Sequence, residues 1–286
     1  MKQLTDHCDY YFKCGDCGEK CTHPAGKCSG DCADCLKEIQ YHRSDGRTDY
    51  DCKNMLRYYT CHTIWKRCSE IMYALETIRL EKYTGFNILS IGCGAAPDLM
   101  AFNEVANGKK VSYHGVDIAT KWKDIHDFII RKSGNADVNF ERRDIYEILD
   151  ENPHKNYNII ILQYMIAGHI YSDRTEKINF LFGEIIDKLI TNKTKNSPLL
   201  LIINDIDHKS WLCDYFNLFI KKLRDNGLEF SYSKRHFKPR EDGENAGSKI
   251  YPSRANKFTS HISAEQRDRY NAHAPCSAAQ LIVEVT

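Results

Sequence analysis

The stretch Asn87–Phe102, NILSIGCGAAPDLMAF, decides the fold. It begins with the apolar run Ile88–Ile91, turns at Gly92 and Gly94, and resumes with Pro97 where a helix would start. This pattern predicts a strand, a tight turn and a helix. Glycines let a ligand approach the backbone closely, and a helix N-terminus directs free N–H groups to the same place, so the turn is typical of nucleotide binding. The same turn also occurs as a plain packing element, so other residues must support the binding role.

Length and composition favour one sizeable domain with a smaller appendage. The chain has 286 residues, of which 42% are apolar, which is enough for a domain of Rossmann size. A formal charge of +1 argues against a surface dominated by polyanion binding, although local basic patches remain compatible with it. No run approaches 18 apolar residues, and the first thirty residues are rich in cysteine and charge. We therefore expect no transmembrane helix, no signal peptide and a cytoplasmic location.

Cysteines are concentrated at the start of the chain, with ten of the thirteen in the first 68 residues. Residues 1–52 contain few apolar side chains, so we expect metal ligation to replace burial as the source of order. The CGDC (14–17) and CADC (32–35) spacings suit tetrahedral zinc. Eight thiols would fill two zinc sites, with His7 and His23 in reserve. The predicted ligands are Cys8, Cys14, Cys17, Cys21, Cys28, Cys32, Cys35 and Cys52.

An iron–sulfur cluster is the main alternative to zinc. Cys28, Cys32 and Cys35 form a CxxxCxxC triplet that resembles the cluster loop of radical enzymes that cleave S-adenosylmethionine. In that family the triplet precedes a barrel of repeating strands and helices, whereas here a helix and a nucleotide-binding turn follow. Disulfides or unligated thiols are further alternatives, and a reducing cytosol disfavours the disulfides.

Residues 53–84 are predicted to form a helix that connects the metal-binding module, 1–52, to the domain 85–286. Apolar side chains recur there at steps of three and four residues, and Tyr83-Thr84-Gly85 breaks the pattern. Cys61 and Cys68 are interpreted as small core residues of this helix.

After the glycine turn, apolar strands alternate with amphipathic segments. Continuous apolar runs flanked by helices predict a parallel sheet that is covered on both faces, with the last two strands at its edge. Helices are expected at 178–190 and 211–223. The expected strands are 111–118, 138–140, 157–165, 198–203, 228–237 and 280–285.

Acidic residues follow the second and third strands. In doubly wound sheets, ligands bind beyond the carboxyl ends of the strands, and an acid at the end of the second strand binds ribose hydroxyls. Asp117 lies 25 residues after Gly92, and Asp144 follows the third strand, where it could meet an adenine amino group. Each acid alone suits a surface position, but the ordered set favours an adenosine ligand.

The dinucleotide fingerprint requires Gly or Ala at position 97, and Pro97 stands there instead, which favours another adenosine ligand. The turn SIGCGAAPD, with GVD, RRD and the apolar strand ending at Gln163-Tyr164, resembles the class I S-adenosylmethionine-dependent methyltransferases over 86–286. The resemblance implies an α/β, Rossmann-like, doubly wound and mostly parallel seven-stranded sheet. It places the glycines at the methionine portion, Asp117 at the ribose and Asp144 at the adenine.

The implied cofactor-binding residues lie at the ends of the first four strands. The family usually has an acid where Ser90 stands, so the methionine amino group needs another partner, for which backbone carbonyls, water and Asp98 are candidates. The full predicted set is Ser90, Gly92, Gly94, Asp98, Asp117, Ile118, Asp144, Ile145, Gln163 and Tyr164.

Methyl transfer from a sulfonium is an in-line displacement, so catalysis needs a nucleophile on axis and, for some acceptors, removal of its proton. The loop after the fourth strand lacks the proline-aromatic signature of amino-methylating nucleic-acid enzymes and the Pro-Cys nucleophile of cytosine C5 enzymes. The predicted catalytic residues are Tyr164, His169 and Asn204, with Asp205 and His208 as further candidates at strand ends.

The methyl acceptor is the least determined feature. Residues 233–257 carry seven Lys/Arg against three Asp/Glu, with Phe237 and Tyr251 as candidate stacking surfaces, which suits either a solvated loop or an RNA-binding patch. A cysteine-rich zinc module before such a domain also resembles some ribosomal-RNA methyltransferases. RNA is therefore slightly favoured over a small molecule or a protein. A zinc-organised binding module without activity is the competing hypothesis.

The metal assignment predicts zinc in protein purified without oxygen. Metal analysis with acid-labile sulfide determination should find about two zinc ions per chain and no sulfide, because eight thiolates fill two tetrahedral sites. Iron with an equivalent amount of sulfide would reverse the assignment in favour of a cluster.

Overall fold

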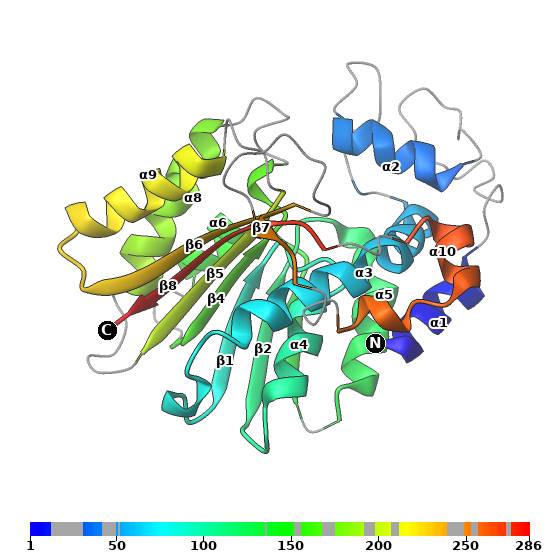
Figure 1. The fold of residues 1–286 in the computed structure, drawn as a ribbon, viewed down its shortest axis with the longest axis horizontal. Coiled ribbons are helices and arrows are strands. Elements are labelled where there is room, and N and C mark those ends of the chain that lie inside the picture. The colour runs from blue at the N-terminus through cyan, green and yellow to red at the C-terminus, as the bar shows by residue number, and fades with distance from the viewer. Residues whose placement is uncertain are drawn as a thin grey trace.

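The computed structural model describes residues 1–12, 31–41, 50, 52–134, 136–151, 156–167, 175–191, 198–206, 212–238, 249–252, 257–272 and 276–286. These residues form one twisted sheet with helices on both faces (Figure 1). The side chains of Cys14, Cys17, Cys21, Cys28, His23, His169 and His208, for which the sequence predicts roles, lie outside the described residues.

The sheet has the order β3-β2-β1-β4-β5-β8-β6-β7. Strands β1 to β5 pair in parallel, whereas β8 lies antiparallel between β5 and β6. The predicted Rossmann-like, mostly parallel sheet with the last two long strands at one edge is confirmed, and the short β7 extends that edge. The strands are β1 (Phe86–Ile91), β2 (Val111–Val116), β3 (Asp137–Glu141), β4 (Ile159–Gln163), β5 (Leu199–Asp205), β6 (Phe230–Lys238), β7 (Lys249–Ile250) and β8 (Ala279–Val285).

Helices α3, α4 and α5 cover one face of the sheet, and α6, α8 and α9 cover the other (Figure 1). The predicted helix at 178–190 is α8 continued by the π-helical segment η4. The helices are α1 (Lys2–Tyr11), α2 (Cys32–Tyr41), α3 (Lys53–Leu75), η2 (Leu80–Lys82), α4 (Pro97–Val105), η3 (Thr120–Trp122), α5 (Lys123–Lys132), α6 (Ile145–Glu151), α8 (Thr175–Glu184), η4 (Ile185–Ile190), α9 (Leu212–Asp225), η6 (Thr259–His261) and α10 (Ala264–Tyr270).

Strand side chains alternate between two cores, as the two-residue period of a strand requires. In β5, Leu200 and Ile202 face the core under α3 and α4, whereas Leu199, Leu201 and Ile203 face the core under α8 and α9. Both faces are apolar, which explains why the strands appear in the sequence as unbroken apolar runs.

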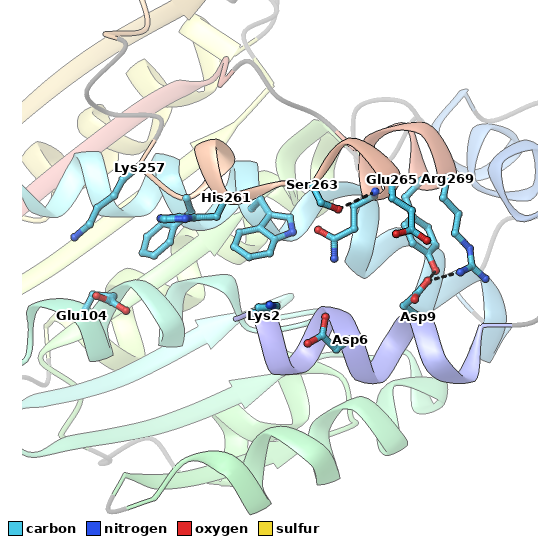
Figure 2. Close-up of a pocket in the computed structure, with 13 residues that line it drawn as sticks. Lys2, Asp6, Asp9, Glu104, Lys257, His261, Ser263, Glu265 and Arg269 are labelled. Carbon is cyan, nitrogen blue, oxygen red and sulfur yellow. Dashed lines mark hydrogen bonds and ion pairs between the residues drawn. The ribbon is translucent and has the colours of Figure 1, made fainter.

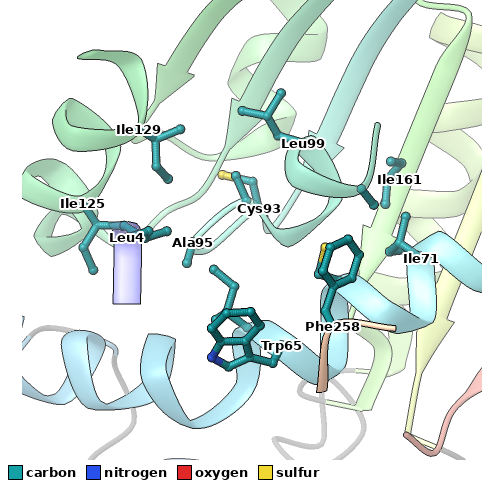
Figure 3. Packing of buried hydrophobic residues seen from close by; sticks show 14 of the residues in the cluster. Leu4, Trp65, Ile71, Cys93, Ala95, Leu99, Ile125, Ile129, Ile161 and Phe258 are labelled. Atoms are coloured by element: carbon teal, nitrogen blue, oxygen red, sulfur yellow. The ribbon is translucent and has the colours of Figure 1, made fainter. Parts of the chain in front are cut away.

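Helix α3 is buried on nearly every side instead of serving only as a connector. Cys61 and Cys68 of α3 are buried, as predicted. The helix packs against α1, α2, α4 and α10, and Figure 3 shows its Trp65 facing Cys93 and Ala95 of the glycine turn. A helix with apolar residues on all sides belongs inside a domain, so α3 is part of the sheet domain's core.

The expectation that residues 1–52 bury no core is wrong for their described part. In α1, Leu4 and Cys8 are buried, and the following Phe12 is 7% exposed. Leu36 and Ile39 of α2 join the same core. These few apolar residues suffice because their helical spacing places them on the side that packs against α3.

Within the part of the chain that the structure describes, no helix combines the length and apolar character that a membrane crossing needs.

The edge of the sheet near β3 depends on a glycine. Gly115 of β2 pairs in register with Phe140, and a Cβ at position 115 would lie 2.7 Å from the Phe140 ring and 2.8 Å from the Tyr113 ring. We therefore expect Gly115→Ala to lower the free energy of unfolding by about 1–3 kcal/mol, because the core must shift to admit the methyl group. Urea unfolding measures this change.

Gly183→Ala in α8 is the matched control. The nearest atom to its added Cβ is Lys222 Nζ at 3.9 Å, so no collision arises. Alanine is the better helix former by about 1 kcal/mol, and the control should keep or raise stability. Equal effects of the two substitutions would contradict the packing argument.

Candidate functional site

The glycine turn lies at the carboxyl end of β1, beside the point where the strand order reverses between β1 and β4. Gly92 and Gly94 have φ of +67° and +50°, a region that side chains rarely adopt. A Cβ at Gly92 would lie 2.6 Å from the Met165 side chain. The turn is anchored to β2, since the N–H groups of Gly92 and Cys93 donate to the Val116 carbonyl at 2.8 and 3.0 Å. Glycine therefore suits position 92 because of its positive φ, and a Cβ added there would also force the Met165 side chain to move.

Asp117 joins the turn to the end of β2. Its carboxylate accepts hydrogen bonds from the N–H groups of Gly94 at 3.0 Å and Ala119 at 2.9 Å. Burial raises the pKa of Asp117, and these hydrogen bonds oppose that shift. Beside it, Ile118 is 70% exposed, so its apolar side chain is open to a ligand. The structure thus brings together a carboxylate and an apolar surface, the two features that ribose hydroxyls and an adenine ring require.

Ser90 and Asp98 lie beneath the turn instead of at an open surface. Asp98 is 1% exposed and accepts a hydrogen bond from the Tyr113 hydroxyl at 3.0 Å. Burial raises the pKa of Asp98 to about 6, against hydrogen bonds from Ser90 and Tyr113. Asp98 on α4 therefore lies next to Ser90, the residue at the strand position where the methyltransferase family was expected to have an acid. Their contact with the cofactor amino group remains a prediction.

Asp144 and Ile145 lie at the start of α6, after β3. The Asp144 carboxylate accepts a hydrogen bond from the Tyr146 N–H at 3.1 Å, and Ile145 is 8% exposed. Asp144 therefore caps the helix, as an aspartate before a first turn commonly does. The adenine contact predicted for these two residues is a separate role that remains a prediction.

The predicted catalytic residues Tyr164 and Asn204 meet at a carboxylate that the sequence analysis missed. Glu70 of α3 is fully buried, and its Oε2 accepts hydrogen bonds from the Tyr164 hydroxyl at 2.7 Å and Asn204 Nδ2 at 3.0 Å. Its Oε1 accepts a hydrogen bond from the Ser277 N–H at 3.0 Å and lies 3.4 Å from Lys66 Nζ. The sequence offered only an indirect signal, an acid with a lysine four residues before it within the predicted helix.

Tyr164 is held in an unusual conformation over this network. It has φ of +57°, and its hydroxyl also accepts a hydrogen bond from Lys66 Nζ at 2.8 Å. Burial raises the pKa of Tyr164 well above its ordinary value, and the Glu70 carboxylate adds to the shift. Tyr164 is therefore a protonated hydroxyl at neutral pH, which suits a hydrogen-bond donor and does not suit a general base.

Arg67 of α3 contacts two tyrosine rings beside these strand ends. Its Cζ is 4.3 Å from the centre of the Tyr164 ring and 4.6 Å from that of Tyr59, and it donates a hydrogen bond to the Tyr59 hydroxyl. Gln163, predicted as a cofactor residue, donates from Nε2 to the Arg67 carbonyl at 2.9 Å. The end of β4 is thereby tied to α3, so the helix covers the carboxyl edge of the sheet.

Asp205, a further catalytic candidate, has its carboxylate occupied by backbone donors. The N–H groups of Ile166, Ala167 and Ile206 donate to it at 2.7, 3.3 and 2.7 Å. Burial nevertheless raises the pKa of Asp205 to about 6. Its geometry fits the anchoring of the segment after β4 better than proton transfer.

The described part of the chain contains no group of three or more metal-ligating side chains. Cys8 forms a hydrogen bond with Cys61 of α3, and Cys32 and Cys35 are buried in the core under α2. Cys52 is half-buried just before α3. Because the other four predicted ligands are not described, zinc binding remains a prediction.

The stacking part of the RNA argument is wrong. Phe237 is 2% exposed and Tyr251 is 4% exposed, and both pack in a small core with Cys276. Neither ring presents a face for a base. Arg235 of the predicted basic segment lies with its Cζ 5.8 Å from the Tyr73 ring centre, so it packs on an aromatic ring of the protein itself.

A separate cavity of about 660 Å³ lies between α1 and α10 (Figure 2). Lys2, Asp6 and Asp9 of α1 face α10 across it, and Arg269 forms an ion pair with Asp9 at 2.7 Å. None of the residues predicted to bind the cofactor lines this cavity. Its lining residues are Lys2, Asp6, Asp9, Trp65, Glu104, Lys257, Phe258, His261, Ser263, Glu265, Gln266, Arg269 and Tyr270.

Neither a scan against protein-family models nor a search of curated proteins finds a match. Among solved structures, the chain is similar to the plantazolicin methyltransferase BpumL in complex with SAH, with a TM-score of 0.47 and 14% identity over 88% of this chain and 94% of that chain. It is also similar to a SAM dependent methyltransferase from Archaeoglobus fulgidus, with a TM-score of 0.44 and 15% identity over 88% and 98%. The cyclase SpnF matches with a TM-score of 0.43 and 16% identity over 76% and 79%.

The strand order and the antiparallel β8 define the class of fold independently of these similarities. A sheet in which β1 to β5 are parallel and the last long strand is inserted antiparallel between β5 and β6 is the class I methyltransferase form of the Rossmann-like fold. The glycine turn, Asp117 and the ends of β4 and β5 lie at the edge where this fold binds its ligand.

The glycine turn also depends on His126 of α5. His126 Nε2 donates to the Gly94 carbonyl at 2.8 Å, and the ring stacks on Phe140 with centroids 4.0 Å apart. Burial lowers the pKa of His126 from 6.5 to about 4, although the hydrogen bond to Gly94 opposes the shift. Between pH 6.5 and pH 4, the His126 side chain is protonated in the unfolded chain but still neutral in the folded protein. The free energy of unfolding therefore decreases as the pH falls through this range.

We expect the stability advantage of wild type over His126→Gln to shrink by about 2–3 kcal/mol between pH 7 and pH 4. Asp98 and Asp205, with raised pKa values, act in the opposite direction over the same range, and the comparison of the two proteins cancels their contribution. Urea unfolding at several pH values gives the difference. A constant difference would show that His126 is not buried in its neutral form.

Proposed function

We propose that the protein is an S-adenosylmethionine-dependent methyltransferase. The observation that carries this proposal is the turn at Gly92 and Gly94, both at positive φ, joined through the Gly94 N–H to the Asp117 carboxylate at the end of β2. This arrangement lies at the switch point of a methyltransferase-type sheet. It provides close backbone approach for the methionine portion and a carboxylate for the ribose.

The residues present fit this cofactor in two respects. Position 92 has no room for a side chain, as expected where a ligand and Met165 approach the same backbone. The exposed Ile118 offers an apolar surface where the adenosine would lie. When bound, the cofactor supplies an activated methyl group on a positively charged sulfur.

The protein's own contribution to catalysis is the positioning of the acceptor and the exclusion of water. We propose that Tyr164 and Asn204 act at the methyl-transfer position, oriented by their shared partner Glu70. Because the Tyr164 hydroxyl proton and an Asn204 N–H are donated to Glu70, these two side chains would act by fixing the shape of the acceptor position and not as free donors. His169, also proposed as catalytic, lies outside the described residues.

The proposed acceptor stays within the three classes that the sequence analysis named, RNA, protein and small molecule. With Phe237 and Tyr251 buried, the argument for RNA is reduced to local positive charge and the analogy with zinc-containing ribosomal-RNA methyltransferases. Zinc bound by the amino-terminal cysteines also belongs to this proposal. Transfer of labelled methyl from S-adenosylmethionine into fractionated cell extract identifies the acceptor class, and an absence of label in every fraction would favour a non-catalytic binding module.

The proposal predicts that S-adenosylmethionine and S-adenosylhomocysteine bind and that NAD does not. Asp117→Ala should weaken binding of both ligands by about 1.5–3 kcal/mol, because it removes charged hydrogen bonds to the ribose hydroxyls. Isothermal titration calorimetry measures each affinity.

Asp137→Ala is the matched control for this substitution. Asp137 lies on the neighbouring β3, exposed, with a hydrogen bond from Ser112 at 3.3 Å. Its removal should leave ligand affinity unchanged. Binding of NAD without binding of either sulfur ligand would contradict the proposal.

A further inference from the structure

Arg67 is a cation without an acidic partner among the described residues. One of its five N–H donors bonds to the Tyr59 hydroxyl, and its Cζ lies 4.6 Å from the centre of the Tyr59 ring and 4.3 Å from that of the Tyr164 ring. None of the ion pairs formed by the described residues includes it. A guanidinium that packs on an aromatic ring keeps its remaining N–H donors in its own plane, where two of them can bind a planar anion through two parallel hydrogen bonds.

The carboxylates around Arg67 are engaged elsewhere. Glu70 accepts from Tyr164, Asn204, Ser277 and Lys66, and Asp205 accepts from three backbone N–H groups. Asp117 accepts from Gly94 and Ala119. Lys66, the neighbouring cation, is already neutralised by Glu70. The guanidinium is therefore the one cation of this cluster that still lacks an anion among the residues described.

The position of Arg67 identifies which anion it would meet. Its carbonyl is bound by Gln163 at the end of β4, and the Tyr164 ring covers one side of its guanidinium. The ring of Tyr59, which also contacts the guanidinium, has its centre 6.2 Å from that of Trp122, which borders Gly94. Arg67 is thus placed between the end of β4 and the glycine turn, where the methionine end of the proposed cofactor would lie.

We propose that Arg67 binds the α-carboxylate of the methionine portion of S-adenosylmethionine. This inference rests on the proposed function and adds a residue to it that lies on α3, outside the motifs of the sheet. The carboxylate is planar and has two oxygens that each accept a hydrogen bond, which matches two N–H donors along one edge of the guanidinium. Tyr59 and Tyr164 hold the guanidinium plane in place before the ligand arrives, so little ordering is needed on binding.

The test compares two ligands that differ only by the carboxylate, S-adenosylhomocysteine and its decarboxylated aminopropyl analogue. Calorimetry should show that wild type binds S-adenosylhomocysteine about 10- to 100-fold more tightly than the analogue, as expected for hydrogen bonds to a charged group. In Arg67→Met this ratio should fall to within about 3-fold of unity, because the carboxylate loses its partner while the adenosine contacts remain. Arg67→Lys keeps the positive charge but lacks the pair of parallel N–H donors, so its affinity ratio should lie between those of the wild type and Arg67→Met.

Arg57→Met is the matched control, because Arg57 lies on the same helix and over the Tyr11 ring but is paired with Asp124 at 2.7 Å. It should retain the wild-type ratio. If Arg67→Met does not fold, a wild-type ratio in Arg67→Lys overturns the inference and a reduced one supports it. A wild-type ratio in folded Arg67→Met overturns it while leaving the proposed function intact. Failure of the wild type to bind S-adenosylhomocysteine would instead contradict the proposed function itself.

Discussion

A single buried carboxylate determines how α3 lies on the sheet. Glu70 has no exposed surface, and burying a charge is costly unless donors surround it. Those donors come from the end of β4, from β5 and from the segment before β8, through Tyr164, Asn204 and the Ser277 N–H. Gln280 adds a hydrogen bond to the Glu70 carbonyl at 2.9 Å. Satisfying Glu70 therefore fixes both the helix and the strand ends, and it holds Arg67 of the same helix beside the end of β4.

The sequence allowed the sheet to be predicted almost completely, because buried parallel strands show as apolar runs whose spacing reflects the helices between them. The Ile88–Ile91 strand, the glycine turn and Pro97 at the first position of α4 are all present. The amino-terminal helices were missed because α1 has a single apolar face with only Leu4, Thr5 and Cys8 buried. Its dense cysteines and charges also suggested a segment ordered by metal alone.

Site residues could be predicted where they belong to a sequence motif, and could not be predicted where their role depends on contacts between distant parts of the chain. Gly92, Gly94 and Asp117 stand at positions set by strand ends, so their proximity could be inferred from order along the chain. Glu70 and Arg67 lie on a helix that the sequence analysis treated as a connector. Their roles depend on which strand ends the helix covers, and neither periodicity nor residue spacing contains that information.

A crystal structure of the protein soaked or grown with S-adenosylhomocysteine tests the central claim most directly. The account predicts the thioether and amino acid portion over Gly92 and Gly94, with the ribose hydroxyls within hydrogen-bond distance of Asp117. A ligand bound at another position, such as the cavity between α1 and α10, or an absence of ligand at the carboxyl edge of β1 despite saturating concentration, would contradict it.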